Sequence, residues 1–512
     1  MTIDAKKFVR PLLLLPLVAS AAASHAESKR PNIILFMVDD MGWQDTSVPF
    51  ADSITANNRK YFTPAMERLA ASGVKFTAAY ASAISSPSRC SLFTGANAAR
   101  HRVTNWTLHR DRTTDGPSET LVPPQWNFNG ISQTPGINNT YVARSFVDRL
   151  RDAGYHTIHV GKAHFGAIDT PGEDPHHFGF EVNITGSAAG GLATYLSERN
   201  YGHDSIGNPV SPFAIEGLDK YWGTGVFATE ALTLEAIKAI EKAKKYNQPW
   251  FLYMAHYAVH VPIDRDKRFY DKYIERGLDP REAAYASLVE GMDKSLGDIL
   301  DWVDANGEAD NTIVIFMSDN GGYAASNDWR AGEPHTQNAP LRGGKGSLLE
   351  GGVREPMIVR WPGHTNAGTA IDENIIIEDF YPSILEMAGI AAPDTIDGRS
   401  FVPLIEGTGN PSQGRALIWN YPNHWGMNGP GINFRCAINK DGWKLIYDYE
   451  TGAKELYNLD KDPYEATNLA RKNPAKAAEM SKALGTALRA MDAQRPSFKA
   501  TGEPCPWPDE VQ

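Results

Sequence analysis

A continuous apolar run near the start of the chain ends in two adjacent aspartates. Residues 32–38 read Asn-Ile-Ile-Leu-Phe-Met-Val, and Asp39-Asp40-Met41-Gly42 follow them. A run without polar alternation is typical of a strand that is buried on both faces, as in a parallel sheet covered by helices on each side. Polar residues that follow such a strand lie at the carboxyl edge of the sheet, where α/β proteins bind ligands. We therefore expect an α/β fold with a ligand site at this edge.

Strand and helix patterns continue to alternate through the first three quarters of the chain. The expected strands cover residues 74–81, 156–160, 250–255, 312–317 and 355–361, and the expected helices cover 64–72, 141–153, 228–245, 282–306 and 379–388. Long segments at 101–140 and 165–222 lack periodicity and are expected to be loops. This alternation predicts a mostly parallel sheet sandwiched by helices.

The pattern changes after residue 400. Residues 403–414 are rich in Gly and Pro, and two strand patterns at 443–449 and 454–459 flank a turn at 450–452. An amphipathic helix is expected at 475–491. We predict three parts: a signal peptide at 1–26, a large α/β domain with the ligand site at 27–407, and a smaller C-terminal α+β subdomain with an antiparallel sheet at 408–512.

The first 26 residues have the composition of a secretory signal peptide. Lys6, Lys7 and Arg10 precede an apolar stretch at 12–23, and Ser24-His25-Ala26 resembles a cleavage site. The apolar stretch is shorter than the roughly 20 residues that a membrane-spanning helix needs. We therefore expect export to the periplasm or the extracellular space, without a membrane span.

Charge and cysteine content restrict the partners of the chain. The net charge of −11 argues against a nucleic-acid partner, and it means that an anionic substrate would need a local basic cluster. The three cysteines, Cys90, Cys436 and Cys505, permit at most one internal disulfide, and their wide spacing excludes the usual cysteine metal sites.

The segment 85–95 places a serine at a predicted helix N-terminus. Pro87 favours the first turn of a helix, and Gly95 is suited to end it. Ser85 would then lie beside unpaired backbone N–H groups and the positive end of the helix dipole, with Arg89 one turn further along. This arrangement would present a nucleophile to an anion, although the pattern by itself is more typical of an ordinary loop-to-helix junction.

Ser85-Ser86-Pro87-Ser88-Arg89, with Leu92 and Thr94-Gly95, resembles the signature of the type I sulfatases, which have an alkaline phosphatase-like fold. The resemblance extends over nearly the whole chain. It implies that Ser85 is oxidised to formylglycine (3-oxoalanine). Because the residue is Ser and not Cys, it also implies a maturase of the radical type as a partner. Cys90 lies five residues too far along the chain to be the modified residue.

Two strand ends carry oxygen donors, Asp39-Asp40 and Asp319-Asn320. Three carboxylates and an amide suit a hard divalent cation such as Ca²⁺ or Mg²⁺ better than zinc. Either pair alone would more often be a turn or a helix cap. Both pairs match the sulfatase pattern, and the resemblance implies Ca²⁺ as the ion, with Mg²⁺ less favoured and an oxygen of modified Ser85 as a further ligand.

Five basic side chains match family positions: Arg89, Lys162, His164, His260 and Lys345. The motifs that carry them include Gly161-Lys162-Ala163-His164, His260-Val261-Pro262 and the segment 344–354. Cations near the sulfur of a sulfate ester would spread the charge that builds up there, and a protonated group must supply the leaving oxygen with a proton.

The resemblance implies a mechanism for these groups. The aldehyde at residue 85 hydrates, and one of its hydroxyls, activated by the metal and by Asp319, attacks sulfur. His260, with Lys345, binds the sulfate and protonates the leaving alcohol, and His164 then removes the proton from the remaining hydroxyl. His256 lies four residues before His260, so spacing alone does not separate the two. The family motif favours His260.

The substrate is expected to be a sulfated carbohydrate or polysaccharide. Further candidates for contact with it are His101, His109, His335 and Arg342, and five tryptophans that could stack on sugar rings: Trp106, Trp126, Trp222, Trp329 and Trp425. Two alternatives remain at this point. One is a phosphate or phosphonate ester hydrolase of the same superfamily, and the other is a catalytically inactive carbohydrate-binding relative.

Overall fold

The computed structural model describes residues 1–2, 30–323, 337–427 and 429–511. Its main element is a nine-stranded sheet with the order β11-β2-β10-β9-β1-β8-β6-β7, and β12 pairs with β2. The strands are β1 (Asn32–Val38), β2 (Val74–Tyr80), β6 (His156–Gly161), β7 (Val182–Ile184), β8 (Trp250–Ala255), β9 (Thr312–Ser318), β10 (Arg354–Arg360), β11 (Thr369–Ile371) and β12 (Ile375–Ile376).

The sheet is mostly parallel, as predicted. β1 lies between β8 and β9 and is parallel to both, with Leu35 opposite Tyr253 on one side and Ile315 on the other. β10 is antiparallel to both of its neighbours, β9 and β2. Because β10 runs in the opposite direction, its amino end lies at the same edge as the carboxyl ends of β1 and β9.

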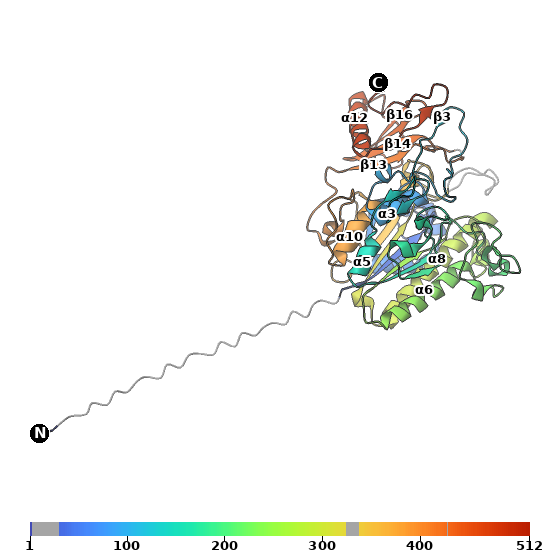
Figure 1. Ribbon diagram of the computed structural model, residues 1–512, viewed down its shortest axis with the longest axis vertical. Coiled ribbons are helices and arrows are strands. Elements are labelled where there is room, and N and C mark those ends of the chain that lie inside the picture. The colour runs from blue at the N-terminus through green and yellow to red at the C-terminus, as the bar shows by residue number, and fades with distance from the viewer. Residues whose placement is uncertain (3–29, 324–336, 428, 512) are drawn as a thin grey trace.

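Helices cover both faces of this sheet (Figure 1). The side chains of β1 alternate between two cores: Ile33, Leu35 and Met37 belong to one, and Ile34, Phe36 and Val38 to the other. The first core also contains residues of α3 (Ser85–Thr94), α5 (Phe146–Asp152) and α10 (Phe380–Met387). The second contains residues of α2 (Pro64–Ser72), α6 (Ala228–Lys244) and α8 (Pro280–Ala305). Burial of each such aliphatic side chain stabilises the fold by about 1.5–3 kcal/mol, which explains the uninterrupted apolar run of β1.

One predicted helix begins later than its pattern indicated. The helix expected at 141–153 is α5, which starts at Phe146, because Tyr141–Val142 form strand β5 and pair with β4 (Ile131–Ser132). Ser145 then accepts a hydrogen bond from the N–H of Asp148 and so caps the helix. The other helices and strands expected from periodicity lie within about two residues of their predicted ends.

The two segments expected to be loops contain short elements only. Elsewhere among the described residues, the short helices are α1 (Ala56–Lys60), α4 (Ala98–His101), α7 (Tyr270–Glu275), α9 (Glu350–Val353) and α11 (Val402–Glu406). The 3₁₀ turns described by the structure lie at 171–173, 175–178, 197–202, 219–221, 309–311 and 377–379. Strand β3 (Leu121–Val122) pairs with β17 (Ser497–Phe498), so the first loop contacts the end of the chain.

A separate antiparallel sheet forms near the C-terminus and lies at the top of Figure 1. Its order is β13 (Ala416–Tyr421), β14 (Arg435–Lys440), β15 (Trp443–Asp448) and β16 (Lys454–Asn458). The strands β15 and β16 were predicted, whereas β13 and β14 were not. Helix α12 (Pro474–Ala490) packs on this sheet through Met480, Leu484 and Leu488. The antiparallel C-terminal sheet is confirmed, and the exact domain limits stay a prediction.

A buried ionic network joins this sheet to the main one. The ammonium group of Lys444 on β15 lies 2.8 Å from a carboxylate oxygen of Glu350 and 3.0 Å from one of Glu465, and all three side chains are fully buried. Glu350 begins α9, five residues after Lys345. The network therefore anchors the glycine-rich segment that carries Lys345.

The cysteines and the leader segment complete the description. Cys90, Cys436 and Cys505 are each buried and free, so none of them forms a disulfide. Residues 3–26 of the predicted signal peptide lie outside the described residues. Within the described part of the chain, no helix combines the length and the hydrophobicity needed to cross a membrane.

Candidate active site

The sequence-predicted site residues meet at the carboxyl edge of the main sheet. β1 ends directly before Asp39, and β9 ends directly before Asp319. Strands β6 and β8 lead to the segments that carry Lys162, His164 and His260. Lys345 lies in the segment that precedes the antiparallel strand β10, whose amino end is at this same edge of the sheet. One edge of the sheet thus collects side chains from five distant segments.

Helix α3 presents Ser85 as its first residue, as predicted. The preceding residue, Ile84, has no side chain that could cap the helix, so the first N–H groups and the positive end of the dipole face the site. Gly95 ends the helix in the left-handed conformation at φ 67°, and its N–H donates to the carbonyl of Ser91. All ten residues of α3 are buried, which holds Ser85 on a rigid support.

The hydroxyl of Ser85 is surrounded by three predicted partners. Its Oγ lies 3.3 Å from Asp39 Oδ1 and 3.1 Å from Asn320 Oδ1. The ammonium group of Lys162 donates to the same oxygen at 2.9 Å and to both carboxylate oxygens of Asp39 at 2.8 and 2.9 Å. An oxygen at this position therefore has carboxylate, amide and ammonium groups within hydrogen-bond distance.

Arg89 lies one turn into α3 and pairs with Asp319. Its Nε and Nη2 are both 2.9 Å from Asp319 Oδ2, and neither side chain is exposed to solvent. Nη1 donates to the carbonyl of Lys162 and to the hydroxyl of Tyr253. Arg89 therefore fixes one oxygen of Asp319, and the other accepts a weak hydrogen bond of 3.3 Å from the N–H of Asp40.

Asp40 is the centre of a second group of contacts. Lys345 Nζ lies 2.8 and 2.9 Å from its two carboxylate oxygens, and Asn320 Nδ2 donates to Oδ1 at 2.8 Å. His260 Nε2 lies 3.6 Å from Oδ2. Asp40 has a φ of 61°, in the left-handed region that non-glycine residues seldom adopt, and such strain is concentrated at functional sites.

Burial and charge separate the pKa values of the two neighbouring aspartates. Burial raises the pKa of Asp39 to about 7, with a further contribution from Asp319 and against the attraction of Lys162. Burial acts on Asp40 as well, but Lys345 and His260 outweigh it and lower the pKa of Asp40 to about 2. Burial lowers the pKa of Lys162, against the opposing charge of Asp39. The site thus holds closely spaced carboxylates whose repulsion a cation would relieve.

The two predicted histidines differ in which ring nitrogen is available. Nε2 of His164 lies 2.9 Å from the carbonyl of Thr107, which can only accept, so Nε2 carries the proton. Its Nδ1 is buried and has no partner among the described residues. In His260, Nδ1 lies 2.7 Å from the carbonyl of Val261, so Nε2 is the nitrogen that faces the site. Burial lowers the pKa of both rings, that of His260 to about 3 with help from Lys345.

A pair of glycines lies against these two rings. A Cβ on Gly190 would lie 2.2 Å from Cε1 of His164, and a Cβ on Gly191 would lie 3.0 Å from Cε1 of His260. His164 itself has a φ of 59°. The lack of a side chain at both positions leaves room for the two rings. In the sequence the pair is an ordinary Gly-Gly within a long loop, so sequence reasoning missed it.

His256 does not belong to the site. Its ring is fully buried, packs 5.1 Å from the ring of Phe36, and has Nε2 2.8 Å from the hydroxyl of Ser295 on α8. The geometry therefore agrees with the choice of His260 from the motif.

Of the further substrate-contact candidates, two have structural roles. His101 is fully buried and lies 3.0 Å from Ser91 Oγ. Arg342 donates to the hydroxyl of Tyr457 in the C-terminal sheet. His109 is exposed, and His335 lies outside the described residues.

Of the four candidate tryptophans that the structure describes, one lies next to a site residue. Trp425 is half-buried, with Lys345 Nζ 6.0 Å from its ring and Tyr323 packed edge-on at 5.9 Å. Trp126 is fully buried, Trp222 packs on His203, Trp106 packs against the core and Trp329 lies outside the described residues. Tyr323, which follows Asn320-Gly321-Gly322, and Tyr253 were not predicted, because a lone tyrosine carries no sequence signal.

The residues present fit a hard divalent cation. The carboxylates of Asp39 and Asp40 and a ring nitrogen of His260 all lie within 4.8 Å of one another, and the two carboxylates are the ligands that such a cation prefers. Asn320 Oδ1 and Ser85 Oγ lie beside them, so the donors are mainly oxygen, which suits Ca²⁺ or Mg²⁺. Asp319, predicted as a ligand, has one oxygen engaged by Arg89 and offers only the other.

Comparison with known proteins identifies the family. The profile of the sulfatase family matches residues 31–390, and that of the C-terminal part of N-sulphoglucosamine sulphohydrolase matches residues 344–494. The chain belongs to the sulfatase family. A sulfatase of Formosa agariphila is 31% identical over 93% of this chain and 91% of its own length, and N-acetylgalactosamine-6-sulfatase of Mus musculus is 29% identical over 88% and 84%.

Solved structures agree with this assignment. The crystal structure of Ps i-CgsB has a TM-score of 0.70 and 26% identity, and covers 92% of this chain and 95% of its own. The same protein has been crystallised in complex with k-i-k-neocarrahexaose. The predicted alkaline phosphatase-like sulfatase fold is therefore confirmed, and this member of the sulfatase family is a sulfuric ester hydrolase.

Proposed function

We propose that this sulfatase hydrolyses sulfate esters of sulfated carbohydrates, with a nucleophile derived from Ser85 and a bound divalent cation. The observation that carries the proposal is the position of Ser85 Oγ at the N-terminus of α3, within 3.3 Å of Asp39 and Asn320 and 2.9 Å from Lys162. The names of the relatives support a glycan substrate, since they include an N-acetylgalactosamine-6-sulfatase and a protein bound to a neocarrahexaose.

The modification and the metal supply chemistry that the twenty amino acids lack. Oxidised to formylglycine and hydrated, residue 85 would offer one hydroxyl for attack on sulfur and a second whose deprotonation allows sulfate to leave; a plain serine would stop after one event. Asp39, Asp40 and Asn320, with the oxygen of Asp319 that Arg89 does not bind, would hold Ca²⁺, which favours the ionised form of an oxygen beside it.

The basic side chains of the chain would bind and stabilise the sulfate group. Lys162 forms an ion pair with Asp39, and Lys345 forms one with the neighbouring Asp40. With a divalent cation present, the cation and the two lysines together carry more positive charge than the carboxylates of Asp39 and Asp40 carry negative charge. An anionic ester is therefore attracted into the site. As the nucleophile approaches sulfur, these fixed charges stabilise the developing negative charge without rearrangement. Arg89 holds Asp319 and the first turn of α3 in fixed positions relative to each other.

The two histidines would move protons. His260 delivers a proton from Nε2 to the leaving alcohol, because its Nδ1 is occupied by the carbonyl of Val261. The negative charge of a bound sulfate favours the protonated ring, against burial and Lys345. His164 has the opposite arrangement: its Nε2 proton is held by Thr107, and the free Nδ1 can accept a proton from the second hydroxyl of residue 85.

Export and maturation belong to the same proposal. The leader at residues 1–26 would direct the protein to the periplasm or the extracellular space, and a radical-type maturase would oxidise Ser85 before or during export. The test is expression with such a maturase, followed by measurement of sulfate released from a panel of defined glycans, including carrageenan oligosaccharides and N-acetylgalactosamine 6-sulfate. Matched phosphate esters serve as the comparison. Release of phosphate but not sulfate, or tight glycan binding without release, would contradict the proposal.

A further inference from the structure

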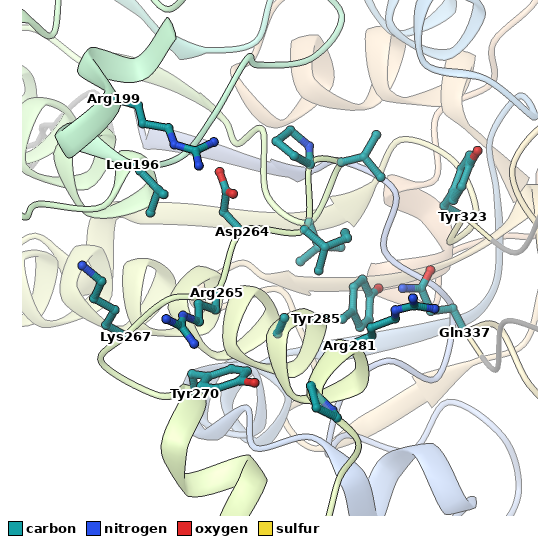
Figure 2. Close-up of a pocket in the computed structure, with 16 residues that line it drawn as sticks. Leu196, Arg199, Asp264, Arg265, Lys267, Tyr270, Arg281, Tyr285, Tyr323 and Gln337 are labelled. Atoms are coloured by element: carbon teal, nitrogen blue, oxygen red, sulfur yellow. The ribbon is translucent and has the colours of Figure 1, made fainter. Parts of the chain in front are cut away.

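A pocket of about 540 Å³ is lined by residues that neighbour proposed catalytic residues in the chain, and Figure 2 shows its lining. Val259 and Val261, which flank His260 in the chain, line it, as does Tyr323, three residues after Asn320. Two separate segments of the chain thus carry both pocket-lining residues and residues of the site. None of the groups assigned above to sulfate binding or proton transfer lines it, so its role is not explained by the chemistry at residue 85.

The lining of this pocket is strongly cationic. Its described lining residues include four basic side chains, Arg199, Arg265, Lys267 and Arg281, and one carboxylate, Asp264. The carboxylate of Asp264 already accepts from the hydroxyl of Thr194 at 2.7 Å and from the N–H of Tyr195 at 2.9 Å. In a chain with a net charge of −11, this concentration of positive charge requires a reason.

Among the residues that the structure describes, three of the four basic side chains have no ion-pair partner. Lys267 pairs with Glu198, but within the described ranges Arg199, Arg265 and Arg281 form no ion pair. They come from different elements: a 3₁₀ turn, the loop after His260, and the first turn of α8. Figure 2 shows Arg199 near Asp264 at one end of the pocket and Arg281 near Tyr285, Tyr323 and Gln337 at the other. The positive charge therefore lines the pocket from several sides.

The remaining lining suits a sugar. Tyr270 and Tyr323 offer aromatic surface, and Leu196, Pro262 and Ile263 add apolar surface between the charges. Arg265 itself lies over the ring of Tyr270 at 5.3 Å, an arrangement that holds its guanidinium group in place. Carbohydrate rings bind to such surfaces through their C–H faces, while their substituents reach polar groups at the rim.

We propose that this pocket binds the neighbouring sugar of a polysulfated oligosaccharide and that its arginines hold a second sulfate ester, which is not cleaved. The inference rests on the proposed function and makes it more specific. Several guanidinium groups that approach from different directions match the three terminal oxygens of a sulfate better than the two coplanar oxygens of a carboxylate, which one arginine satisfies. The enzyme would then prefer substrates with sulfate on adjacent sugars.

The test compares two substrates that share the scissile sulfate: one oligosaccharide with a second sulfate on the adjacent sugar and one without it. For the wild-type enzyme we expect a higher kcat/KM on the disulfated compound. In Arg281→Gln and Arg265→Gln, the ratio of the two kcat/KM values should fall by about tenfold for each substitution, and the salt dependence of the ratio should weaken. Arg471→Gln is the control, since Arg471 is exposed on the C-terminal subdomain and lines no part of the pocket.

Binding gives a second readout that does not depend on turnover. In the Ser85→Ala variant, calorimetry should find that the disulfated oligosaccharide binds more tightly than compounds in which the second sulfate is replaced by a carboxylate or a hydroxyl group. The double variant with Arg281→Gln should bind all three with similar affinity. An unchanged kcat/KM ratio in the arginine variants, or tighter binding of the carboxylated compound, would overturn the inference while leaving sulfate hydrolysis intact. If the wild-type enzyme cleaves neither substrate, the proposed function itself fails.

Discussion

The ammonium group of Lys162 lies 2.9 Å from the hydroxyl of Ser85, and both side chains are buried. The same ammonium group pairs with Asp39, so it bridges the residue proposed as nucleophile and a proposed metal ligand. We predict that Lys162→Ala lowers kcat/KM by about 10²–10³-fold, the cost typical of removing one preorganised group that stabilises transition-state charge. Lys162→Arg should not restore the rate, because the planar guanidinium does not fit the space of a point charge.

Each of these variants requires a check on its own maturation and fold. The fraction of modified residue 85 is measured by mass spectrometry, and the rates are divided by it. Circular dichroism reports whether the fold is kept. A Lys162→Ala protein that is modified, folded and as fast as wild type would show that the contact has no catalytic role.

His260 and His256 provide a matched pair. His260→Ala should lower kcat by about 10²–10⁴-fold on sugar sulfates, since these have basic leaving groups that need a proton. The loss should be much smaller on aryl sulfates, whose leaving groups need little protonation. His256→Ala should mainly lower the melting temperature, because His256 packs in the core against Phe36. Equal losses on both substrates in His260→Ala would exclude its role as the acid.

The glycines behind the histidines are predicted to affect rate more than stability. In Gly190→Ala the new Cβ would lie 2.2 Å from the His164 ring, so the ring must move and its hydrogen bond to Thr107 is lost. We expect kcat to fall by about 10–100-fold. Gly297→Ala on α8 is the control, since its Cβ would make only an ordinary 3.4 Å contact with Ala65 and alanine favours the helix. Wild-type kinetics in Gly190→Ala would show that the ring position is not critical.

Removal of the metal should abolish activity reversibly. Dialysis against a chelator is expected to remove about one ion per chain, and calcium should restore the rate better than magnesium, because the site offers several protein oxygens instead of the water-rich shell that magnesium keeps. Elemental analysis measures the ion directly. The Asp40→Asn variant should bind the ion more weakly or not at all. Full activity after verified removal of all divalent ions would contradict the assigned ligands.

Stability should depend on pH through Glu378, which is remote from the proposed chemistry. Burial raises the pKa of this carboxyl from 4.5 to about 7, helped by Asp379 and opposed by Arg415, and Asn97 donates to it at 2.8 Å. The folded protein therefore retains a proton between pH 4.5 and 7 that the unfolded chain has lost. This contribution to stability is complete below about pH 4.5 and disappears as the pH rises through 7.

The isosteric variant Glu378→Gln carries no such proton. Relative to wild type, it should gain stability as the pH is raised from 5 to 8, by at most about 3 kcal/mol. Urea unfolding at the two pH values measures the difference. An identical pH dependence in both proteins would show that Glu378 is ionised in the folded state.

Much of the fold could be predicted from the sequence where periodicity is strong. β1 and β9 lie in the middle of the sheet with both faces covered, so their apolar runs are uninterrupted, and the carboxylates that follow them had to lie at one edge. The start of α5 was misplaced, because the pairing of Tyr141–Val142 with β4 is a tertiary contact that local spacing does not encode. For the same reason the strands β13 and β14 were missed.

The site could be predicted only in part. Motifs identified the charged residues, which the structure brings together, but not their pairing: Asp319 faces Arg89, while Asp40 is shared by Lys345, Asn320 and His260. The glycines at 190–191 and the cationic pocket depend on the folding of long loops, whose conformation leaves no periodic signal. His101 was a candidate by residue type alone, and its burial is decided by packing around α3.

The central claim concerns residue 85, and the tryptic peptide Phe76–Arg89 contains it. Mass spectrometry of this peptide, from preparations whose sulfate release has been measured, tests the claim most directly. We predict that the active fraction of each preparation equals the fraction of peptide that has lost the two hydrogen atoms removed in the oxidation of serine to formylglycine, and that preparations made without the maturase are inactive. A fully active enzyme with unmodified serine at position 85 would contradict the account.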